Sequence, residues 1–246
     1  MAEPVIRALS MSLAGPADQP VLDELALLAE LVDLDGARVL ELGCGAAQKT
    51  FEIVRASGVA EVVAAEVDAI QHEKNLAADA PANVRFARFG AEAIHAADAS
   101  FDLVLMFKSL HHVPLAAMDT ALAEIRRVLK PGGVAWISEP VFAGAFNEVM
   151  RIFHDEEQVR ARAFEAVRRA VEQGLFELVD ERFFLTPIRF DSLDQFERRM
   201  LGVTHTEHRL DAATLARVRE TFLSCERDGA FRFEVPNRVD VLRASL

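Results

Sequence analysis

The 246-residue sequence predicts an α/β fold, in which helices cover both faces of a doubly wound, mostly parallel sheet. Short apolar segments alternate with amphipathic helical segments from residue 18 to residue 140. The apolar segments end in glycine or in polar residues. Right-handed crossovers bring the carboxyl ends of parallel strands to one edge of the sheet, and such edges bind ligands. We therefore expect the polar residues to gather at a binding site.

The elements of the first half follow one another closely. Leucines and valines at helical spacing predict an amphipathic helix over residues 18–34, which Asp35-Gly36 ends. Five strands are expected at ARVLELG, EVVAAEVD, VRFARF, FDLVLMF and VAWISEP. Helices between them are expected over residues 46–57, 69–79 and 115–130.

The pattern changes after Pro140. The expected elements are one or two helices from Phe146 to Val171, a strand or bent strand pair at FELVDERFFLTPIRF, helices over residues 191–201 and 211–224, and one or two closing strands at FRFEVPNRVDVLRASL. No Ser- or Pro-rich linker divides the chain. We expect one domain over residues 1–246, with a core over residues 37–140 and cap helices and closing strands over residues 141–246.

Composition excludes several classes of protein. No apolar run is long enough to cross a bilayer, and the first ten residues lack the basic start and apolar middle of a signal peptide. The formal net charge of -12 argues against nucleic acid as an obligatory partner, because phosphate binding needs clustered Lys and Arg. Cys44 and Cys225 do not make a disulfide framework, so a cytoplasmic location is expected.

A glycine-rich turn is the first candidate binding feature. LELGCGAAQK places Gly43 and Gly45 between the first core strand and the next helix, where glycine lets the backbone approach a ligand and adopt a positive φ. A purely structural turn is the alternative interpretation. Glu66 ends the second strand about 20 residues later, at the position where an acidic side chain meets ribose hydroxyls. Together these residues predict a nucleoside-containing cofactor.

Five motifs occur in a characteristic order: ELGCG, an acidic residue ending the second strand, SFDLVLM, LHHV and RVLKPGG. Over residues 37–140 the chain thereby resembles class I S-adenosylmethionine-dependent methyltransferases. The resemblance implies a Rossmann-like, seven-stranded sheet with an N-terminal helix and a helical cap inserted after strand five. It also implies S-adenosyl-L-methionine as cofactor and S-adenosyl-L-homocysteine as product. The remainder of the chain matches no specific substrate subfamily.

The resemblance assigns most of the cofactor contacts. By analogy with the family, the methionine part faces Glu41, Gly43 and Gly45, the ribose hydroxyls meet Glu66, adenine packs on Val67, and Asp68 is an alternative polar contact.

Two positions depart from the pattern of the family. An Asp after strand three usually meets the adenine amino group, but Gly90 stands there in this chain. The backbone of Ala91 and the carboxylate of Glu92 are the expected substitutes, and Phe107 at the end of strand four is a further expected cofactor contact. Ala47 replaces the third glycine of the loop, which is tolerable if that glycine only allowed close helix packing.

The segment FKSLHHVP, after strand four, is the candidate catalytic region, because in this fold it lies beside the transferable methyl group. Methyl transfer is an in-line displacement that depends on positioning and desolvation, and histidine suits removal of the acceptor's proton. Because adjacent histidines seldom point the same way, we expect one of His111 and His112 to face the pocket, and favour His112. The alternative is that both are structural.

Two charged residues accompany the histidines. Lys108 is expected to bind an anionic substrate or to position the cofactor, unless it only lies on the surface. Glu139 ends strand five and is expected to orient a histidine or to bind a substrate amine. A helix cap or a salt bridge is the alternative for Glu139. His205 and His208 have a spacing that could bind metal, but nothing fixes the other ligands, so no metal site is predicted.

We therefore expect a methyltransferase that acts on an O, N or S atom of a small molecule in a covered pocket. The acidic charge and the helical insertion argue against an open groove for a polymer. The expected partner is the small-molecule acceptor, with neither nucleic acid nor membrane, and a homodimer is an open option. The alternatives are a protein or tRNA methyltransferase and a non-catalytic regulator that binds S-adenosylmethionine.

Overall fold

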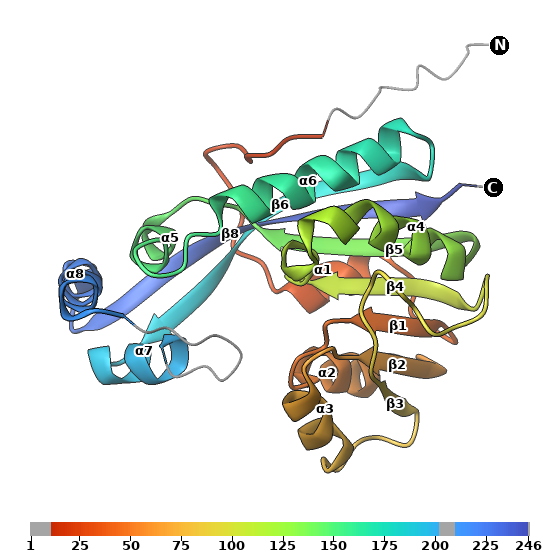
Figure 1. The fold of residues 1–246 in the computed structure, drawn as a ribbon, viewed down its shortest axis with the longest axis horizontal. Helices are drawn as coiled ribbons and strands as arrows, with labels where there is room; N and C mark the ends of the chain where they lie inside the picture. The colour runs from red at the N-terminus through yellow and green to blue at the C-terminus, as the bar shows by residue number, and fades with distance from the viewer. Residues whose placement is uncertain (1–10, 202–209, 246) are drawn as a thin grey trace.

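The computed structural model describes residues 11–201 and 210–245, and one sheet organises them (Figure 1). Its strands are β1 (Arg38–Leu42), β2 (Glu61–Ala65), β3 (Val84–Ala87), β4 (Phe101–Phe107), β5 (Leu129–Pro140), β6 (Phe176–Phe190), β7 (Glu226–Arg227) and β8 (Ala230–Ala244). The order across the sheet is β3-β2-β1-β4-β5-β8-β6, and β7 pairs with β8. Seven strands lie on this path, and the two-residue β7 makes an eighth.

The predicted α/β fold is confirmed, because β1 to β5 run parallel and β8 is antiparallel to both β5 and β6. The helices are α1 (Glu24–Leu31), α2 (Gln48–Ala56), α3 (Ala69–Leu76), α4 (Met118–Val128), α5 (Ala145–Met150), α6 (Glu157–Glu172), α7 (Leu193–Met200) and α8 (Ala212–Leu223). The 3-10 turns η1 (Leu110–His112) and η2 (Leu115–Ala117) follow β4. Among the helices described, none has the length and hydrophobicity that a membrane crossing requires.

The N-terminal helix is shorter than residues 18–34. Asp23 begins it by accepting hydrogen bonds from the backbone N–H groups of Leu25 (3.0 Å) and Ala26 (2.8 Å). Such a cap satisfies backbone donors that have no partner within the helix. Residues 18–22 do not form a helix, and Val21 and Leu22 instead contact Leu185 of β6 through a bridge and a 3.1 Å hydrogen bond.

The helices after β5 do not form a single cap. Helix α6 packs beside α4 and covers the sheet, whereas α7 and α8 lie in the connection between β6 and β8 (Figure 1). Helices α7 and α8 thus lie between the two strands where the sequence predicts helices over residues 191–201 and 211–224, and only α5 and α6 directly follow β5.

A separate hydrophobic core lies where α5, α7 and α8 pack on β6 and β8. It contains Phe146, Val149, Phe190, Phe196, Val218, Phe222, Phe231 and Phe233, contributed by α5, β6, α7, α8 and β8. The ring of Phe222 stacks on those of Phe196 and Phe231, with centroids 4.3 and 4.2 Å apart. These phenylalanines therefore pack mainly against one another.

Candidate active site

The glycine turn after β1 takes a conformation that demands glycine. Gly43 and Gly45 have φ values of +72° and +51°, which side chains rarely adopt. A Cβ on Gly43 would lie 2.7 Å from the Cβ of Ser109, whereas nothing lies within 4 Å of a Cβ on Gly45. The loop thus packs tightly against the end of β4 at Gly43 and leaves open space at Gly45.

Ala47 corrects one expectation. Its φ is +57°, and it stands at the start of α2 without a side-chain cap. The third glycine that the family places in this loop would therefore suit the backbone conformation, and not only close packing. A left-handed conformation costs an L-residue about 1–2 kcal/mol.

Glu66 is held at the carboxyl end of β2 and is largely buried. Its two oxygens accept hydrogen bonds from the N–H groups of Gly45 (2.8 Å) and Asp68 (2.9 Å). Val67 beside it leaves 59% of its surface exposed. Asp68 caps α3 by accepting a hydrogen bond from the N–H of Ile70 (2.8 Å). The side chain of Asp68 thus has a structural partner already.

Glu41 is a buried carboxyl group beneath the glycine turn. It is 2% exposed and accepts a hydrogen bond from the hydroxyl of Thr50. Burial raises the pKa of Glu41 to about 7, and the neighbouring Glu66 acts in the same direction, while the Thr50 hydroxyl and the Lys49 ammonium oppose the rise. Glu41 is therefore a group whose charge depends on pH near neutrality.

A carboxylate also lies at the loop after β3. The side chain of Glu92 turns back over Gly90, so that its oxygens lie where a Cβ on residue 90 would sit. Ala91 between them is buried. Glu92 is thus placed where the carboxylate of an aspartate at residue 90 would be expected.

Lys108 and Phe107 mark the end of β4. Phe107 is buried, with the ammonium of Lys49 4.6 Å from its ring centroid. Lys108 has a φ of +56°, and its Nζ donates to Oε2 of Glu24 at 2.8 Å. Lys108 is thus ion-paired with the N-terminal helix at the base of the site.

Glu24 of α1 is a site residue that the sequence did not reveal. Its carboxylate is buried and accepts hydrogen bonds from Lys108, from Lys49 at 2.7 Å and from the hydroxyl of Ser138. Burial would raise the pKa of Glu24, but the two ammonium groups outweigh burial and hold this pKa below its ordinary value. The N-terminal helix is thereby tied to β4 and β5.

His111 is the buried histidine of the pair. Its Nδ1 pairs with Oε2 of Glu139, whose Oε1 accepts the N–H of Leu110 at 2.9 Å. Glu139 thus contacts a histidine, which is one of the roles anticipated for it. Burial lowers the pKa of His111, but Glu139 and then Glu156 more than offset burial and raise it to about 9.

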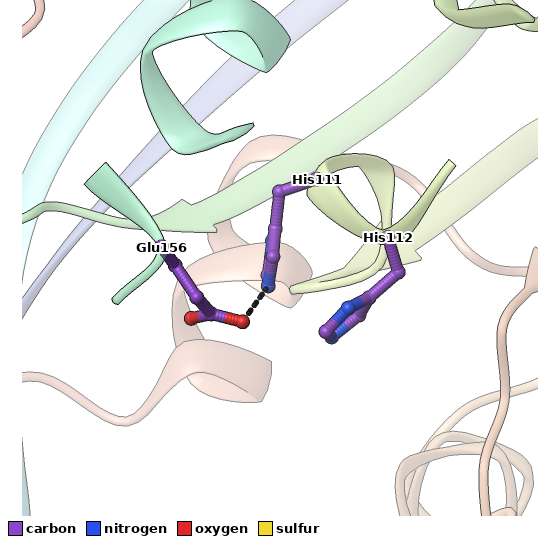
Figure 2. A group of neighbouring side chains, drawn as sticks. All are labelled: His111, His112 and Glu156. Carbon is purple, nitrogen blue, oxygen red and sulfur yellow. Dashed lines mark ion pairs between the residues drawn. The ribbon is translucent and has the colours of Figure 1, made fainter. Parts of the chain in front are cut away.

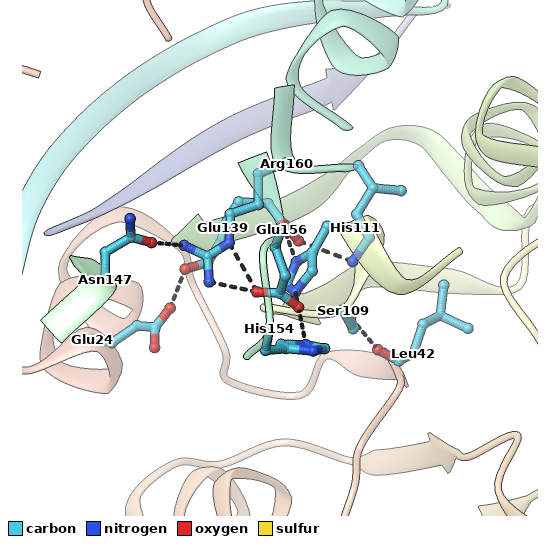
Figure 3. A network of polar contacts seen from close by, with 11 residues as sticks. Glu24, Leu42, Ser109, His111, Glu139, Asn147, His154, Glu156 and Arg160 are labelled. Carbon is cyan, nitrogen blue, oxygen red and sulfur yellow. Dashed lines mark hydrogen bonds and ion pairs between the residues drawn. The ribbon is translucent and has the colours of Figure 1, made fainter. Parts of the chain in front are cut away.

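Glu156 faces the other side of the His111 ring and was not anticipated. Its Oε1 lies 3.6 Å from Nε2 of His111 and 2.8 Å from Nε2 of His154, and its Oε2 accepts two hydrogen bonds from Arg160 (Figure 3). Burial would raise the pKa of Glu156, but His111 and Arg160 hold it well below its ordinary range. Only Glu156 of the three consecutive acids Asp155, Glu156 and Glu157 is buried.

His112 is exposed, but its ring lies beside that of His111, with the two centroids 4.1 Å apart. The expectation that the two side chains point apart is wrong, because η1 replaces the alternation of a strand with a 3-10 turn. Burial of part of the ring and the neighbouring His111 lower the pKa of His112. One ligand atom from each of His111, His112 and Glu156 lies within 4.8 Å of the other two (Figure 2).

The histidines and the glycine turn share one edge of the sheet. The Ser109 hydroxyl, two residues before His111, donates to the backbone oxygen of Leu42 at 2.8 Å (Figure 3). His205 and His208 lie outside the described residues.

The side chains at this edge fit an S-adenosylmethionine-like ligand. The open space at Gly45 lets a ligand reach the backbone, and Glu66 offers oxygens beside it. The exposed Val67 and Ile70, the latter 61% exposed, provide an uncovered apolar surface next to that carboxylate. Carboxylates suit ribose hydroxyls and an amino group, and apolar side chains suit a flat purine.

Comparisons with known proteins point the same way. Residues 39–133 match a family model described as a methyltransferase domain. Over 127 residues the chain is 32% identical to the methyltransferase GfsG of Streptomyces halstedii, and this match covers 50% of the chain and 45% of that enzyme. The chain thus aligns with less than half the length of this relative.

Two solved structures have the same fold. A Bacillus halodurans protein assigned as a methyltransferase has a TM-score of 0.65 and 19% identity, over 91% of this chain and 99% of its own. The YcgJ protein of Bacillus subtilis has a TM-score of 0.60 and 18% identity, over 90% of this chain and 97% of its own. At this level of identity the likeness concerns the fold.

Proposed function

We propose that the chain, whose residues 39–133 match a methyltransferase domain, is an S-adenosylmethionine-dependent enzyme that transfers a methyl group to an O, N or S atom of a small molecule. The observation that carries the proposal is the shared edge, where the end of β4 packs on the glycine turn and presents His111 and His112. When bound, S-adenosylmethionine supplies a methyl group on a sulfonium, whose sulfur keeps the bonding electrons as the acceptor's lone pair attacks.

The residues of β1 to β3 would hold the cofactor. Glu66 would accept hydrogen bonds from the ribose hydroxyls, and the exposed Val67 would pack on adenine. Glu92, folded over Gly90, would supply the carboxylate that meets the adenine amino group. Glu41 lies beneath the turn and would face the positively charged methionine part.

The histidine cluster, defined as His111, His112 and Glu156, would receive the acceptor. His112 is the member that an acceptor can reach, because its side chain is exposed while His111 and Glu156 are buried. Glu139 fixes the ring of His111, and Arg160 fixes the carboxylate of Glu156. The cluster would orient the acceptor's heteroatom and draw off its proton as the new bond to carbon forms.

A small molecule is favoured as acceptor by the charge of the chain. A net charge of -12 disfavours long-range attraction between the chain and a phosphate backbone. The purified protein should therefore not retain tRNA or DNA at physiological salt. Tight retention that weakens steeply as salt rises would support a tRNA methyltransferase instead.

The proposal is tested by turnover. Methyl groups labelled on S-adenosylmethionine are followed into a panel of small hydroxyl, amine and thiol compounds. His112→Ala should lower turnover by about 10²–10⁴-fold while cofactor affinity stays within a few-fold, since its role concerns the acceptor. His95→Ala, a change at an exposed histidine after β3, is the control. Full activity of His112→Ala would remove the cluster from the reaction, and cofactor binding without turnover on any compound would favour a regulator.

A further inference from the structure

We propose that the histidine cluster binds a divalent transition-metal ion such as Zn²⁺, through Nε2 of His111, one ring nitrogen of His112 and a carboxylate oxygen of Glu156. The binding of the ion is independent of catalysis. The purpose assigned to it, activation of the acceptor, rests on the proposed function. The three ligand atoms lie within 4.8 Å of one another (Figure 2).

The spacing is close to that of a zinc site. Ligand atoms that lie about 2.0–2.1 Å from a tetrahedral ion are ~3.4 Å from each other. Nε2 of His111 and Oε1 of Glu156 are 3.6 Å apart, so this pair needs almost no movement. His112 is exposed, so a rotation of its side chain would have to bring its ring nitrogen closer to the other two ligand atoms. A site with two imidazoles and one carboxylate binds zinc in preference to magnesium or calcium.

The surroundings hold two of the three ligands in place. Nδ1 of His111 faces Glu139, which leaves Nε2 pointing at Glu156. A carboxylate on the far nitrogen of a ligating histidine is the usual support of zinc sites, since it fixes the ring and makes it a stronger base. Arg160 and His154 also hold the carboxylate of Glu156 in place.

The charge around the cluster favours a cation. The buried carboxylates Glu139 and Glu156 both face His111, and Arg160 is the cation that pairs with one of them. One negative charge remains if the imidazole is neutral, and buried charges need a partner. A proton on the imidazole is one such partner, and a metal ion that replaces the Nε2 proton is the other.

Three protein ligands leave the ion an open coordination position, which is the arrangement of catalytic zinc sites. The exposed side of the cluster is the side at which an acceptor would arrive. An oxygen or sulfur of the acceptor that binds there would lose its proton to solvent more readily, because the ion lowers its pKa. With the ion bound, His112 would act as a ligand and not as the group that takes the proton. A metal ion at this position therefore favours an acceptor that presents a hydroxyl or a thiol group.

The test measures binding of the metal alone. Untagged protein is freed of metal with a chelator and titrated with Zn²⁺ by calorimetry, and with Co²⁺ while the visible absorption of the ion is recorded. We expect one equivalent in the wild type, and affinity at least about 10-fold weaker in His112→Ala and Glu156→Gln. Two variants serve as controls: His95→Ala changes an exposed histidine elsewhere, and Glu157→Gln changes the exposed glutamate next to Glu156. Both should bind the metal as the wild type does.

The outcomes separate the two claims. His112→Ala changes an exposed side chain, so its fold should persist, and circular dichroism checks Glu156→Gln. Failure of the wild type to bind, or equal binding by both variants, overturns the metal site; the second result would point to ligands elsewhere. Titration of the same samples with S-adenosylhomocysteine reports on the proposed function independently, since cofactor binding without metal binding leaves that function intact.

Discussion

Glu41 provides a prediction whose size follows from its burial. Its carboxyl group is 2% exposed, and its pKa is raised from 4.5 to about 7. In the unfolded chain this group ionises above pH 4.5, whereas in the folded protein it keeps its proton to about pH 7. The folded state thus binds more protons over this interval, and its stability falls as pH rises through 7.

The magnitude comes from the difference in pKa, which is 7 minus 4.5. At about 1.4 kcal/mol per pKa unit, this difference corresponds to about 3.5 kcal/mol over the whole titration. Part of that loss occurs below pH 5, so the wild type should lose about 2–3 kcal/mol of its free energy of unfolding between pH 5 and pH 8 through this group. Glu41→Gln keeps an oxygen for the Thr50 hydroxyl but cannot ionise. The variant should therefore gain about 2–3 kcal/mol on the wild type over the same interval.

The assay is urea unfolding at pH 5, 6, 7 and 8. Trp136 is the single tryptophan and is fully buried in β5, so its fluorescence reports loss of the core. The pKa of Glu181 is also raised to about 7, by burial first, but it contributes equally to both proteins and cancels in their difference. Glu52→Gln, on the exposed side of α2, is the control. A difference between Glu41→Gln and wild type that does not change with pH would refute the reasoning.

Three further predictions concern packing. Gly43→Ala should lower the free energy of unfolding by about 2 kcal/mol or more and weaken cofactor binding, because its Cβ would meet Ser109 at 2.7 Å and its φ is +72°. The control Gly132→Ala has a φ of +76° but nothing within 4 Å of its Cβ, so it should lose only about 1–2 kcal/mol in the same urea assay. Ala47→Gly should raise the free energy of unfolding by up to about 1 kcal/mol by relieving a φ of +57°, and a decrease would mean that its buried methyl matters more. Phe222→Ala should lower the free energy of unfolding by about 3–5 kcal/mol, because it removes the ring that stacks between those of Phe196 and Phe231. Calorimetry at low temperature should find unchanged cofactor affinity, and a large change in affinity would show that this core supports the site.

The cofactor half of the fold could be predicted from sequence because its signals are local. Alternating strands and helices, glycines in a turn and an acidic residue after β2 all lie within short segments. Parallel topology then brings their ends to one edge without further information.

The acceptor side depends on contacts between distant segments. Glu24 reaches Lys108 from 84 residues away. Glu156 is one of three consecutive acidic residues, and only the packing of α6 against η1 selects it for burial beside His111. Neither residue carries a local signal that separates it from a surface carboxylate.

Binding of S-adenosylhomocysteine, measured by calorimetry, tests the central claim most directly. We expect one site per chain, with affinity weakened in Glu66→Ala by about 1–3 kcal/mol, the usual loss when a buried hydrogen-bonding partner is removed. Glu61→Ala, at the opposite end of β2 where it pairs with Arg38, should bind like the wild type. Absence of binding by the wild type, or equal binding by Glu66→Ala, would contradict the cofactor site described above.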